Sequence, residues 1–237
     1  MIDVFTIAVI TIGQSPRPDI TQDLKRLLPE NFRITEYGAL DGLTRQEALA
    51  RFGYQGRGEL LITRMGGSGQ ALNVDGDAIM RQLQTCIHRA EADGAHAAMI
   101  ACTGVFPAYQ HKIPLFLPGA AQRKQALKLA GDQPIGVLIP KEDQKEQITQ
   151  WWRGSGAGSI LFGIADPYGD PNEIRRAAGA LKTAGAQVLC LDCFGYTVCQ
   201  QQEVERSTGL ATVLPRKTLI GEIVTHLEDA IPSSPSV

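Results

Sequence analysis

The chain has 237 residues, and its 23 Lys and Arg against 25 Asp and Glu leave a formal net charge of −2. This length gives room for one large domain or two small lobes with a real core. The near-balance of charge, without a polybasic stripe, argues against a nucleic-acid or membrane-surface partner, and no apolar run approaches the roughly 20 residues of a membrane helix. The five cysteines are scattered and no export signal is recognised, so we expect reduced thiols in a cytoplasmic protein.

Strand and helix patterns alternate through the first half of the chain. The apolar run over residues 4–12 is typical of a strand that is buried on both faces of a parallel sheet. The next predicted elements are a helix over 21–28, a strand over 32–40, a hairpin of 60–63 and 71–74 around the glycine-rich segment 66–69, a helix over 75–92 capped by Gly94, and a strand over 97–101.

The same alternation resumes in the second half. The pattern predicts strands over 135–139, 159–164, 187–192 and 211–214, and helices over 145–152, 172–184 and 216–229. Residues 231–237 are polar and rich in proline, so we expect a disordered tail there. Alternation of this kind predicts an α/β fold with mainly parallel sheets flanked by helices.

Short segments of the two halves match one another in the same order, which indicates an internal repeat. The matching pairs are 7–10 with 135–138, 102–104 with 193–195, and 117–118 with 214–215. We therefore expect two pseudo-symmetric lobes with an active-site cleft between them. Lobe A is expected from residues 1–115 plus 212–230, and lobe B from residues 116–211.

Cys102 and Cys193 occupy the same place in this repeat. Each follows a predicted buried strand and has a glycine two positions later, Gly104 or Gly195. Ligands of open α/β sheets bind beyond the carboxyl ends of the strands, and a glycine there lets the chain turn and present backbone N–H groups. We expect the two thiols to face each other as an acid/base pair. A sulfur-to-sulfur distance of roughly 6–9 Å would leave about 3–3.5 Å from each sulfur to a central carbon.

Four segments of the chain resemble the AroM-like family, and the resemblance spans nearly the whole sequence. They are Gln14-Ser15-Pro16-Arg17, Leu61-Ile62-Thr63-Arg64, Cys102-Thr103-Gly104-Val105-Phe106-Pro107 and Leu191-Asp192-Cys193-Phe194-Gly195-Tyr196. The paired cysteine segments also resemble the wider aspartate/glutamate/hydantoin racemase superfamily. This resemblance implies a fold of two similar α/β lobes.

The resemblance also implies proton transfer without a cofactor or a metal. In racemases of this superfamily one cysteine thiolate removes an α-proton, and the other cysteine, as a thiol, delivers a proton to the opposite face. A free thiol has a pKa near 8.5, which falls when hydrogen bonds or a helix N-terminus stabilise the thiolate. We therefore expect both protonation states to be accessible near neutral pH.

The chain departs from the racemase pattern at three places. Racemases commonly carry Asn-Thr and Thr-His after the two cysteines, whereas this chain has Thr103-Gly104 and Phe194-Gly195. It also has Gln14 before Ser15, where an Asp is usual. An amino-acid substrate needs a carboxylate near its ammonium group, so Gln14 argues against one. A dicarboxylate or a keto or hydroxy acid is favoured instead.

The predicted site therefore belongs to a racemase- or isomerase-type enzyme that binds a small carboxylic acid, with a homodimer left open as its assembly. Arg17 and Arg64 lie near predicted strand ends and are candidates to hold one or two carboxylates. The full set is Cys102 and Cys193 as catalytic residues, with Gln14, Ser15, Arg17, Arg64, Thr103, Gly104, Gly195, Tyr196 and Thr197 as substrate-binding residues.

Other interpretations of these residues stay open. Each cysteine by itself is equally typical of a small buried side chain at a strand end, Ser15 of a turn or helix N-cap, and the arginines of a solvated surface. Cys190 and Cys193 have the spacing of a redox pair but lie in a predicted strand, and no histidine adds a zinc-binding spacing. The alternative function is a non-catalytic small-carboxylate-binding or sensory protein. Loss of either thiol would favour it, and both are present.

Overall fold

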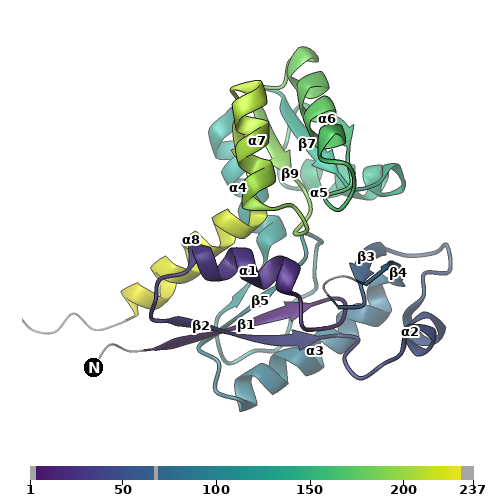
Figure 1. Cartoon of the computed structure of the whole chain (residues 1–237), viewed down its shortest axis with the longest axis vertical. Coiled ribbons are helices and arrows are strands. Elements are labelled where there is room, and N and C mark those ends of the chain that lie inside the picture. Colours follow the sequence, from purple (N-terminus) through teal and green to yellow (C-terminus); the bar gives the residue numbers. More distant parts are fainter. Residues whose placement is uncertain (1–3, 67–68, 231–237) are drawn as a thin grey trace, which may run out of the picture.

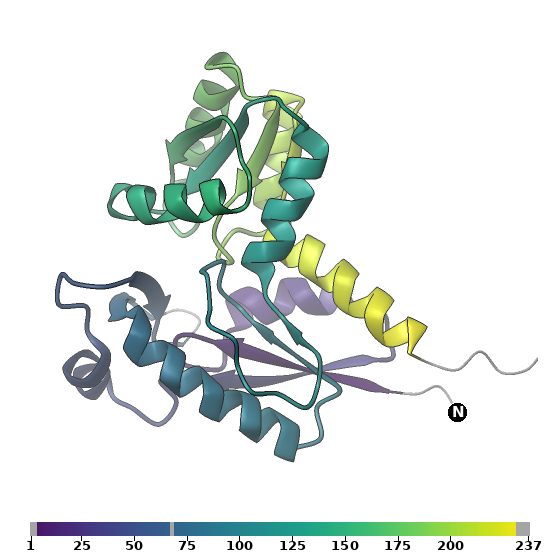
Figure 2. The same cartoon turned by 180° about the vertical axis from the view of Figure 1, so that it is seen from behind.

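The computed structural model describes residues 4–66 and 69–230, and Figures 1 and 2 show two lobes stacked one above the other. The first lobe is built on a parallel sheet with the strand order β2-β1-β5-β6. Its strands are β1 (Phe5–Thr11), β2 (Phe32–Gly38), β5 (Ala97–Ile100) and β6 (Leu115–Phe116). One face of the sheet packs on helices α1 (Pro18–Leu27) and α8 (Pro215–Asp229), and the other face packs on α3 (Gly76–Ala92).

Strand β1 shows why this segment of the sequence is continuously apolar. Ile7 and Val9 pack with α1 and α8, whereas Ala8 and Ile10 pack with α3. Successive side chains of a strand point to opposite faces, so a strand covered on both faces needs apolar residues at every position. The predicted strand over 4–12 is confirmed with slightly shorter bounds.

The second lobe repeats this plan with the strand order β10-β9-β7-β8, which read backwards corresponds to β2-β1-β5-β6. Its strands are β7 (Ile135–Ile139), β8 (Ile160–Ile164), β9 (Val188–Leu191) and β10 (Ala211–Val213), all parallel. Helices α4 (Pro118–Ala130) and α5 (Lys145–Gly154) cover one face, and α6 (Pro171–Thr183) and α7 (Val198–Thr208) cover the other. The predicted fold class, α/β with two pseudo-symmetric lobes, is confirmed.

Helices α4 and α8 pack against each other where the lobes join. The strand pairings place Leu115–Phe116 in the first sheet and Ala211–Val213 in the second. The sheets therefore extend one or two residues past the boundaries expected at 115/116 and 211/212. With boundaries shifted by these one or two residues, the division into lobe A (1–115 plus 212–230) and lobe B (116–211) stays a proposal. The tail expected to be disordered, 231–237, lies outside the described residues.

The predicted hairpin is present and reaches from the first lobe toward the second. It consists of β3 (Leu60–Arg64) and β4 (Ala71–Asp75), which pair antiparallel. Its turn includes residues 67–68, which lie outside the described part of the chain. The amide of Gln147 on α5 donates to the Leu60 carbonyl at 3.3 Å and accepts from the Leu60 N–H at 3.1 Å. These bonds hold the hairpin over the junction between the lobes.

Three helices have no predicted range: α2 (Arg45–Phe52), α4 and α7. The short strand β6 and a 3₁₀ turn, η1 (Glu142–Gln144), have none either. Helices α2 and α7 both begin with a capping box, Thr44 with Glu47 and Thr197 with Gln200. Such a Thr-x-x-Glu/Gln signature is readable in a sequence and would have indicated both starts.

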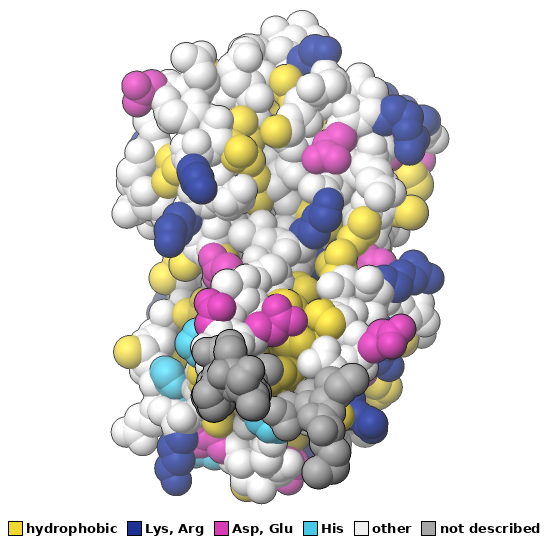
Figure 3. Space-filling model, turned by 90° about the vertical axis from the view of Figure 1, so that its left-hand side faces the viewer, with side chains coloured by type: hydrophobic (Ala, Val, Ile, Leu, Met, Phe, Trp, Pro, Cys, Tyr) yellow, Lys and Arg dark blue, Asp and Glu magenta, His cyan; other side chains and the backbone are white. Residues whose placement is uncertain are grey.

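On the face shown in Figure 3 the basic and acidic side chains are interspersed, without a broad patch of one sign. Within the described residues, no helix is both long and apolar enough to span a bilayer.

Candidate active site

One pocket lies between the lobes, at the carboxyl ends of both sheets. Its wall includes Cys102 beyond β5 and Cys193 beyond β9, with apolar side chains such as Leu61, Ile148 and Trp151 between them. The pocket holds about 90 Å³ of free space, which limits a ligand to a small molecule. Across the residues that the structure describes, no three His, Cys, Asp or Glu side chains are arranged to hold a metal ion.

The backbone around the two cysteines is arranged in the same way. The residue before each cysteine donates its N–H to the neighbouring strand of its own sheet. Ala101 donates to the Ile10 carbonyl at 2.7 Å, and Asp192 donates to the Leu138 carbonyl at 2.8 Å. Each cysteine N–H then returns to the carbonyl two residues earlier, at 2.9 Å in both lobes. Both thiol-bearing segments therefore leave their sheets by the same path and meet at one pocket.

A backbone N–H two residues further on is directed at each sulfur. The N–H of Gly195 donates to Cys193 Sγ at 3.3 Å, and the N–H of Gly104 makes the equivalent bond to Cys102. A Cβ at Gly195 would lie 2.9 Å from side-chain atoms of Pro167 and Tyr168. Close packing against the β8–α6 loop therefore favours glycine at position 195, whose φ is not among the positive values that would themselves call for glycine.

Burial raises the pKa of Cys102 to about 12 and that of Cys193 to about 11. The glycine N–H groups lower both values, but by less than burial raises them, and the Asp192 carboxylate adds repulsion at both thiols. At neutral pH both side chains are therefore thiols. The expectation of a thiolate accessible near pH 7 is wrong for this arrangement, because burial outweighs the hydrogen bonds.

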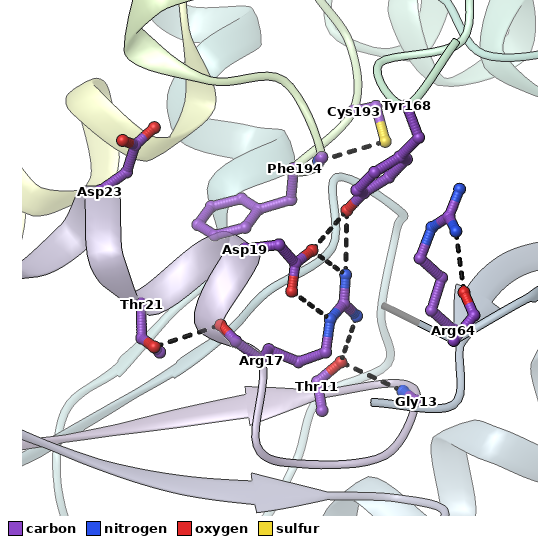
Figure 4. Close-up of polar contacts among 12 residues, drawn as sticks. Thr11, Gly13, Arg17, Asp19, Thr21, Asp23, Arg64, Tyr168, Cys193 and Phe194 are labelled. Atoms are coloured by element: carbon purple, nitrogen blue, oxygen red, sulfur yellow. Dashed lines mark hydrogen bonds and ion pairs between the residues drawn. The ribbon is translucent and has the colours of Figure 1, made fainter. Parts of the chain in front are cut away.

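Arg17 lies on the pocket wall but is paired with an acidic side chain in the first turn of α1 (Figure 4). Its Nε and Nη2 donate to the two carboxylate oxygens of Asp19 at 2.9 and 2.7 Å. Its Nη1 donates to Thr11 Oγ1 at 3.2 Å, and its Nη2 to the Tyr168 hydroxyl at 3.0 Å. Burial opposes the charged form, but Asp19 and Tyr168 outweigh it and raise the pKa of Arg17. The charge of Arg17 is therefore already compensated.

Arg64 brings an uncompensated positive charge to the same pocket. Its guanidinium carbon lies 3.7 Å from the centroid of the Tyr168 ring, and its Nη1 donates to the Gly69 carbonyl at 2.8 Å. No carboxylate of residues 4–66 or 69–230 lies within ion-pair distance of Arg64, and Lys141 on the same wall also has none. Of the two arginines that the sequence suggested, Arg64 is the one available for a carboxylate.

Gln14 and Ser15 do not line the pocket. The Ser15 N–H and hydroxyl donate to the two oxygens of Asp41 at 2.7 and 2.8 Å. The Gln14 amide donates to the Leu43 carbonyl at 3.1 Å. These polar groups therefore stabilise the loop after β1. For Ser15 this is the turn role that the sequence also allowed. Asp41 was not singled out in the sequence.

Thr103, Gly104 and Gly195 line the pocket, but Tyr196 and Thr197 do not. Tyr196 is fully buried in the second lobe, and its hydroxyl donates to the Ala165 carbonyl at 2.5 Å. Thr197 is the N-cap of α7, where its hydroxyl oxygen accepts from the helix backbone. Tyr196 supports the core and Thr197 starts a helix, so the geometry does not support substrate contacts for either.

Several polar residues on the pocket wall were absent from the sequence-based set. They are Thr63, Lys141, Gln144, Asp166, Tyr168 and Asp192. Tyr168 belongs to the loop between β8 and α6 and crosses to the first lobe, where its hydroxyl donates to Asp19 Oδ2 at 2.7 Å. Its place beyond the carboxyl end of a strand is the one sequence feature that would have pointed to it.

Asp192 is a buried carboxyl group that connects the two cysteine loops. It accepts from Trp152 Nε1 at 2.7 Å and from the Gln122 amide, and the Thr103 side chain also hydrogen-bonds to it. Burial raises the pKa of Asp192, although these donors lower it. Because Asp192 precedes Cys193 and Thr103 follows Cys102, this network joins the backbone segments that carry the thiols.

Solved structures share this fold over nearly the full chain. Allantoin racemase from Klebsiella pneumoniae has a TM-score of 0.63 and 13% identity, covering 97% of this chain and 90% of that one. Unliganded arylmalonate decarboxylase has a TM-score of 0.60 and 15% identity, covering 98% and 97%. Glutamate racemase from Aquifex pyrophilus has a TM-score of 0.56 and 16% identity, covering 94% and 84%. At these identities the likeness establishes the fold alone.

No curated protein matches the sequence. The family described as AroM protein matches residues 7–227, which include both cysteine segments and all the strands of both sheets except the first two residues of β1. The chain therefore belongs to the AroM protein family, on the fold of the aspartate, glutamate and allantoin racemases.

Proposed function

We propose that this chain is a cofactor-independent enzyme of the racemase or isomerase type, acting on a small carboxylic acid through Cys102 and Cys193. The observation that carries the proposal is that both thiols line one small pocket, each with the same backbone surroundings in its own lobe. The equal strand orders of the sheets support the internal repeat that pairs the two cysteines. Solved structures of this fold include racemases and a decarboxylase, which supports the reaction class.

In the proposed reaction one cysteine acts as thiolate and the other as thiol. The thiolate accepts the α-proton, and the electron pair of the broken C–H bond moves into the neighbouring carboxylate. The thiol on the opposite side then gives its proton to the same carbon and becomes the thiolate. No proton is consumed, and the configuration of the carbon is inverted. Arg64 holds the carboxylate and stabilises the charge that develops on it.

Burial raises the pKa of both thiols, and the charge of one thiolate opposes ionisation of the other thiol. One thiolate at a time is therefore favoured, and either cysteine can be the base, as a reaction that runs in both directions requires. Because the thiolate fraction grows about tenfold per pH unit below the pKa, the rate should rise with pH through the alkaline range.

The same pKa values favour a second function, a carboxylate-binding or sensory protein that uses the pocket without chemistry. Thiols that stay protonated act as weak hydrogen-bond donors and not as bases. The pocket, Arg64 and the β3–β4 hairpin would serve a binding protein equally well.

Exchange of the α-proton with deuterated solvent separates the two functions. The wild type is incubated at pD 9 with lactate, mandelate, succinate or glutamate, and the α-proton signal is followed by NMR. An enzyme exchanges the α-proton of at least one acid. Cys102→Ser and Cys193→Ser, which are nearly isosteric, should each slow that exchange by about 100-fold or more. Cys199→Ser, at an exposed cysteine outside the pocket, should keep the wild-type rate. Binding of these acids without any exchange would establish the second function.

A further inference from the structure

Tyr168 connects the two lobes at the pocket. It lies in the loop between β8 and α6 of the second lobe, yet its hydroxyl and ring meet polar groups of the first. The hydroxyl accepts from Arg17 Nη2 at 3.0 Å and donates to Asp19 Oδ2 at 2.7 Å, while the ring lies under the Arg64 guanidinium, 3.7 Å from its carbon (Figure 4). One side chain therefore contacts both arginines of the pocket wall in different ways.

Arg17 has little capacity left for a ligand. It makes four side-chain hydrogen bonds, two to Asp19 and one each to Thr11 and Tyr168. A carboxylate that bound Arg17 with both oxygens would have to displace Asp19, which holds the guanidinium in that same two-point geometry. Arg17 therefore stabilises the protein's own structure and does not offer its donors to a ligand.

Arg64 is in the opposite situation. The only side-chain hydrogen bond of Arg64 among the described residues goes to a backbone carbonyl, that of Gly69. Stacking on an aromatic ring uses the flat face of a guanidinium and leaves the N–H groups at its edge for ligands. The ring of Tyr168 therefore restricts where Arg64 lies without occupying its donors. The hydroxyl bonds to Arg17 and Asp19 link the loop of Tyr168 to the first lobe.

We propose that Tyr168 is a positioning residue of this site: its ring holds Arg64 so that Arg64, and not Arg17, receives the substrate carboxylate. This inference rests on the proposed function, because it takes the ligand to be a small carboxylic acid. It adds a residue from the second lobe to a carboxylate site otherwise built on the hairpin of the first. A carboxylate then binds fully only when the two lobes are in the arrangement that brings Tyr168 over Arg64.

The test measures binding of succinate and of mandelate to the full chain by calorimetry. Tyr168→Leu and Arg64→Ala should each weaken binding about tenfold. Tyr168→Phe and Tyr168→Trp keep a ring face and should stay within about threefold of the wild type. Arg64→Lys keeps the charge but not the flat guanidinium, so it should weaken binding to a degree between Arg64→Ala and the wild type. Tyr54→Leu, at a tyrosine outside the pocket, is the matched control.

The outcomes separate this inference from the proposed function. If the wild type binds and Tyr168→Leu binds equally well, the positioning role is wrong and the proposed function stands. The positioning role is also wrong if Arg64→Ala has no effect, or if Tyr168→Phe loses as much affinity as Tyr168→Leu, because then the hydroxyl and not the ring matters. If the wild type binds neither acid, both proposals fail. Thermal melting of each variant checks that the fold is intact. If Tyr168→Leu unfolds, the affinities of Tyr168→Phe and Tyr168→Trp decide whether the ring face is what binding requires.

Discussion

Arg17 and Asp19 form a two-point ion pair where the loop after β1 enters α1, with Arg17 as the N-cap of the helix and Asp19 in its first turn. Nε and Nη2 of the arginine lie 2.9 and 2.7 Å from the two carboxylate oxygens, and the side chains are only 6% and 19% exposed. A buried guanidinium that loses its partner keeps its charge in a poorly solvated place, which costs far more than the loss of a surface pair. The pair thereby fixes the edge of the pocket on which Tyr168 rests.

Replacing Asp19 with alanine should lower the free energy of unfolding by about 3 kcal/mol, because Arg17 is left buried and unpaired. Urea denaturation measures the change. Glu142→Ala removes the partner of Lys145 in an exposed pair, with side chains 64% and 48% exposed, and should change the free energy by less than about 0.5 kcal/mol. A loss for Asp19→Ala as small as that of the control would show that the pair is not structural.

Glu59 should make the stability of the protein depend on pH near neutrality. Burial, with a smaller contribution from the Asp77 carboxylate, raises the pKa of Glu59 to about 7. The folded state thus holds this proton to a higher pH than the unfolded state, whose glutamates titrate near 4.3. The resulting stabilisation is complete below about pH 4 and is lost as the pH rises through 7.

The wild type should therefore lose stability relative to Glu59→Gln between pH 5 and pH 8. Urea denaturation of both proteins at these two values gives the difference directly. Glu142→Gln, at an exposed glutamate, should follow the wild type at both. Equal differences between the wild type and Glu59→Gln at pH 5 and at pH 8 would contradict a raised pKa.

The elements that were predicted from the sequence are those marked by a pattern of neighbouring residues. The buried strands are continuous apolar runs, and the helices before β5 and β9 end at Gly94 and Gly185, whose φ values of 80° and 101° favour glycine. Helices α2 and α7 were missed although each begins with a capping box, and α7 also ends at a left-handed glycine, Gly209.

The site was predictable only where it depends on the ends of strands. Cys102, Thr103, Gly104, Cys193 and Gly195 are on the pocket wall because each follows a buried strand. The position of Tyr168 beyond β8 could be read from the sequence, but its contacts could not, because its hydroxyl meets Asp19 and Arg17, which lie 149 and 151 positions away in the chain. Neither hydrophobic periodicity nor residue spacing reveals a contact between two lobes.

Alkylation of the two pocket thiols should be slow at neutral pH and accelerate strongly with alkalinity. Burial raises the pKa of Cys193 to about 11 and that of Cys102 to about 12. Iodoacetamide reacts with the thiolate, so both rates should rise about tenfold per pH unit between pH 7 and 10. Peptide mass spectrometry reads each site, with the exposed Cys199 as internal reference. Pocket thiols that react at pH 7 as fast as Cys199 would contradict the raised pKa values.

Three acidic side chains act on different thiols, so neutralising each one should give a different pattern. Burial is the main cause of both raised pKa values, but the Asp192 carboxylate adds to both, Glu59 to that of Cys102 and Asp166 to that of Cys193. At pH 9, Glu59→Gln should therefore accelerate alkylation of Cys102 only, and Asp166→Asn that of Cys193 only.

Asp192→Asn should accelerate the alkylation of both thiols, because it removes the one carboxylate that repels both thiolates. The new amide retains the shape of the Asp192 side chain. Its N–H₂ group, however, would face the N–H₂ group with which Gln122 now donates to Asp192. Gln122 Oε1 is buried without a partner, so rotation of the Gln122 amide turns an acceptor toward that N–H₂ group. The variant should therefore fold, whereas Asp192→Ala leaves Trp152 Nε1 without its acceptor and should lose about 1–3 kcal/mol of stability. Alkylation that accelerates at only one cysteine in Asp192→Asn would mean that the carboxylate does not act on the two thiols together.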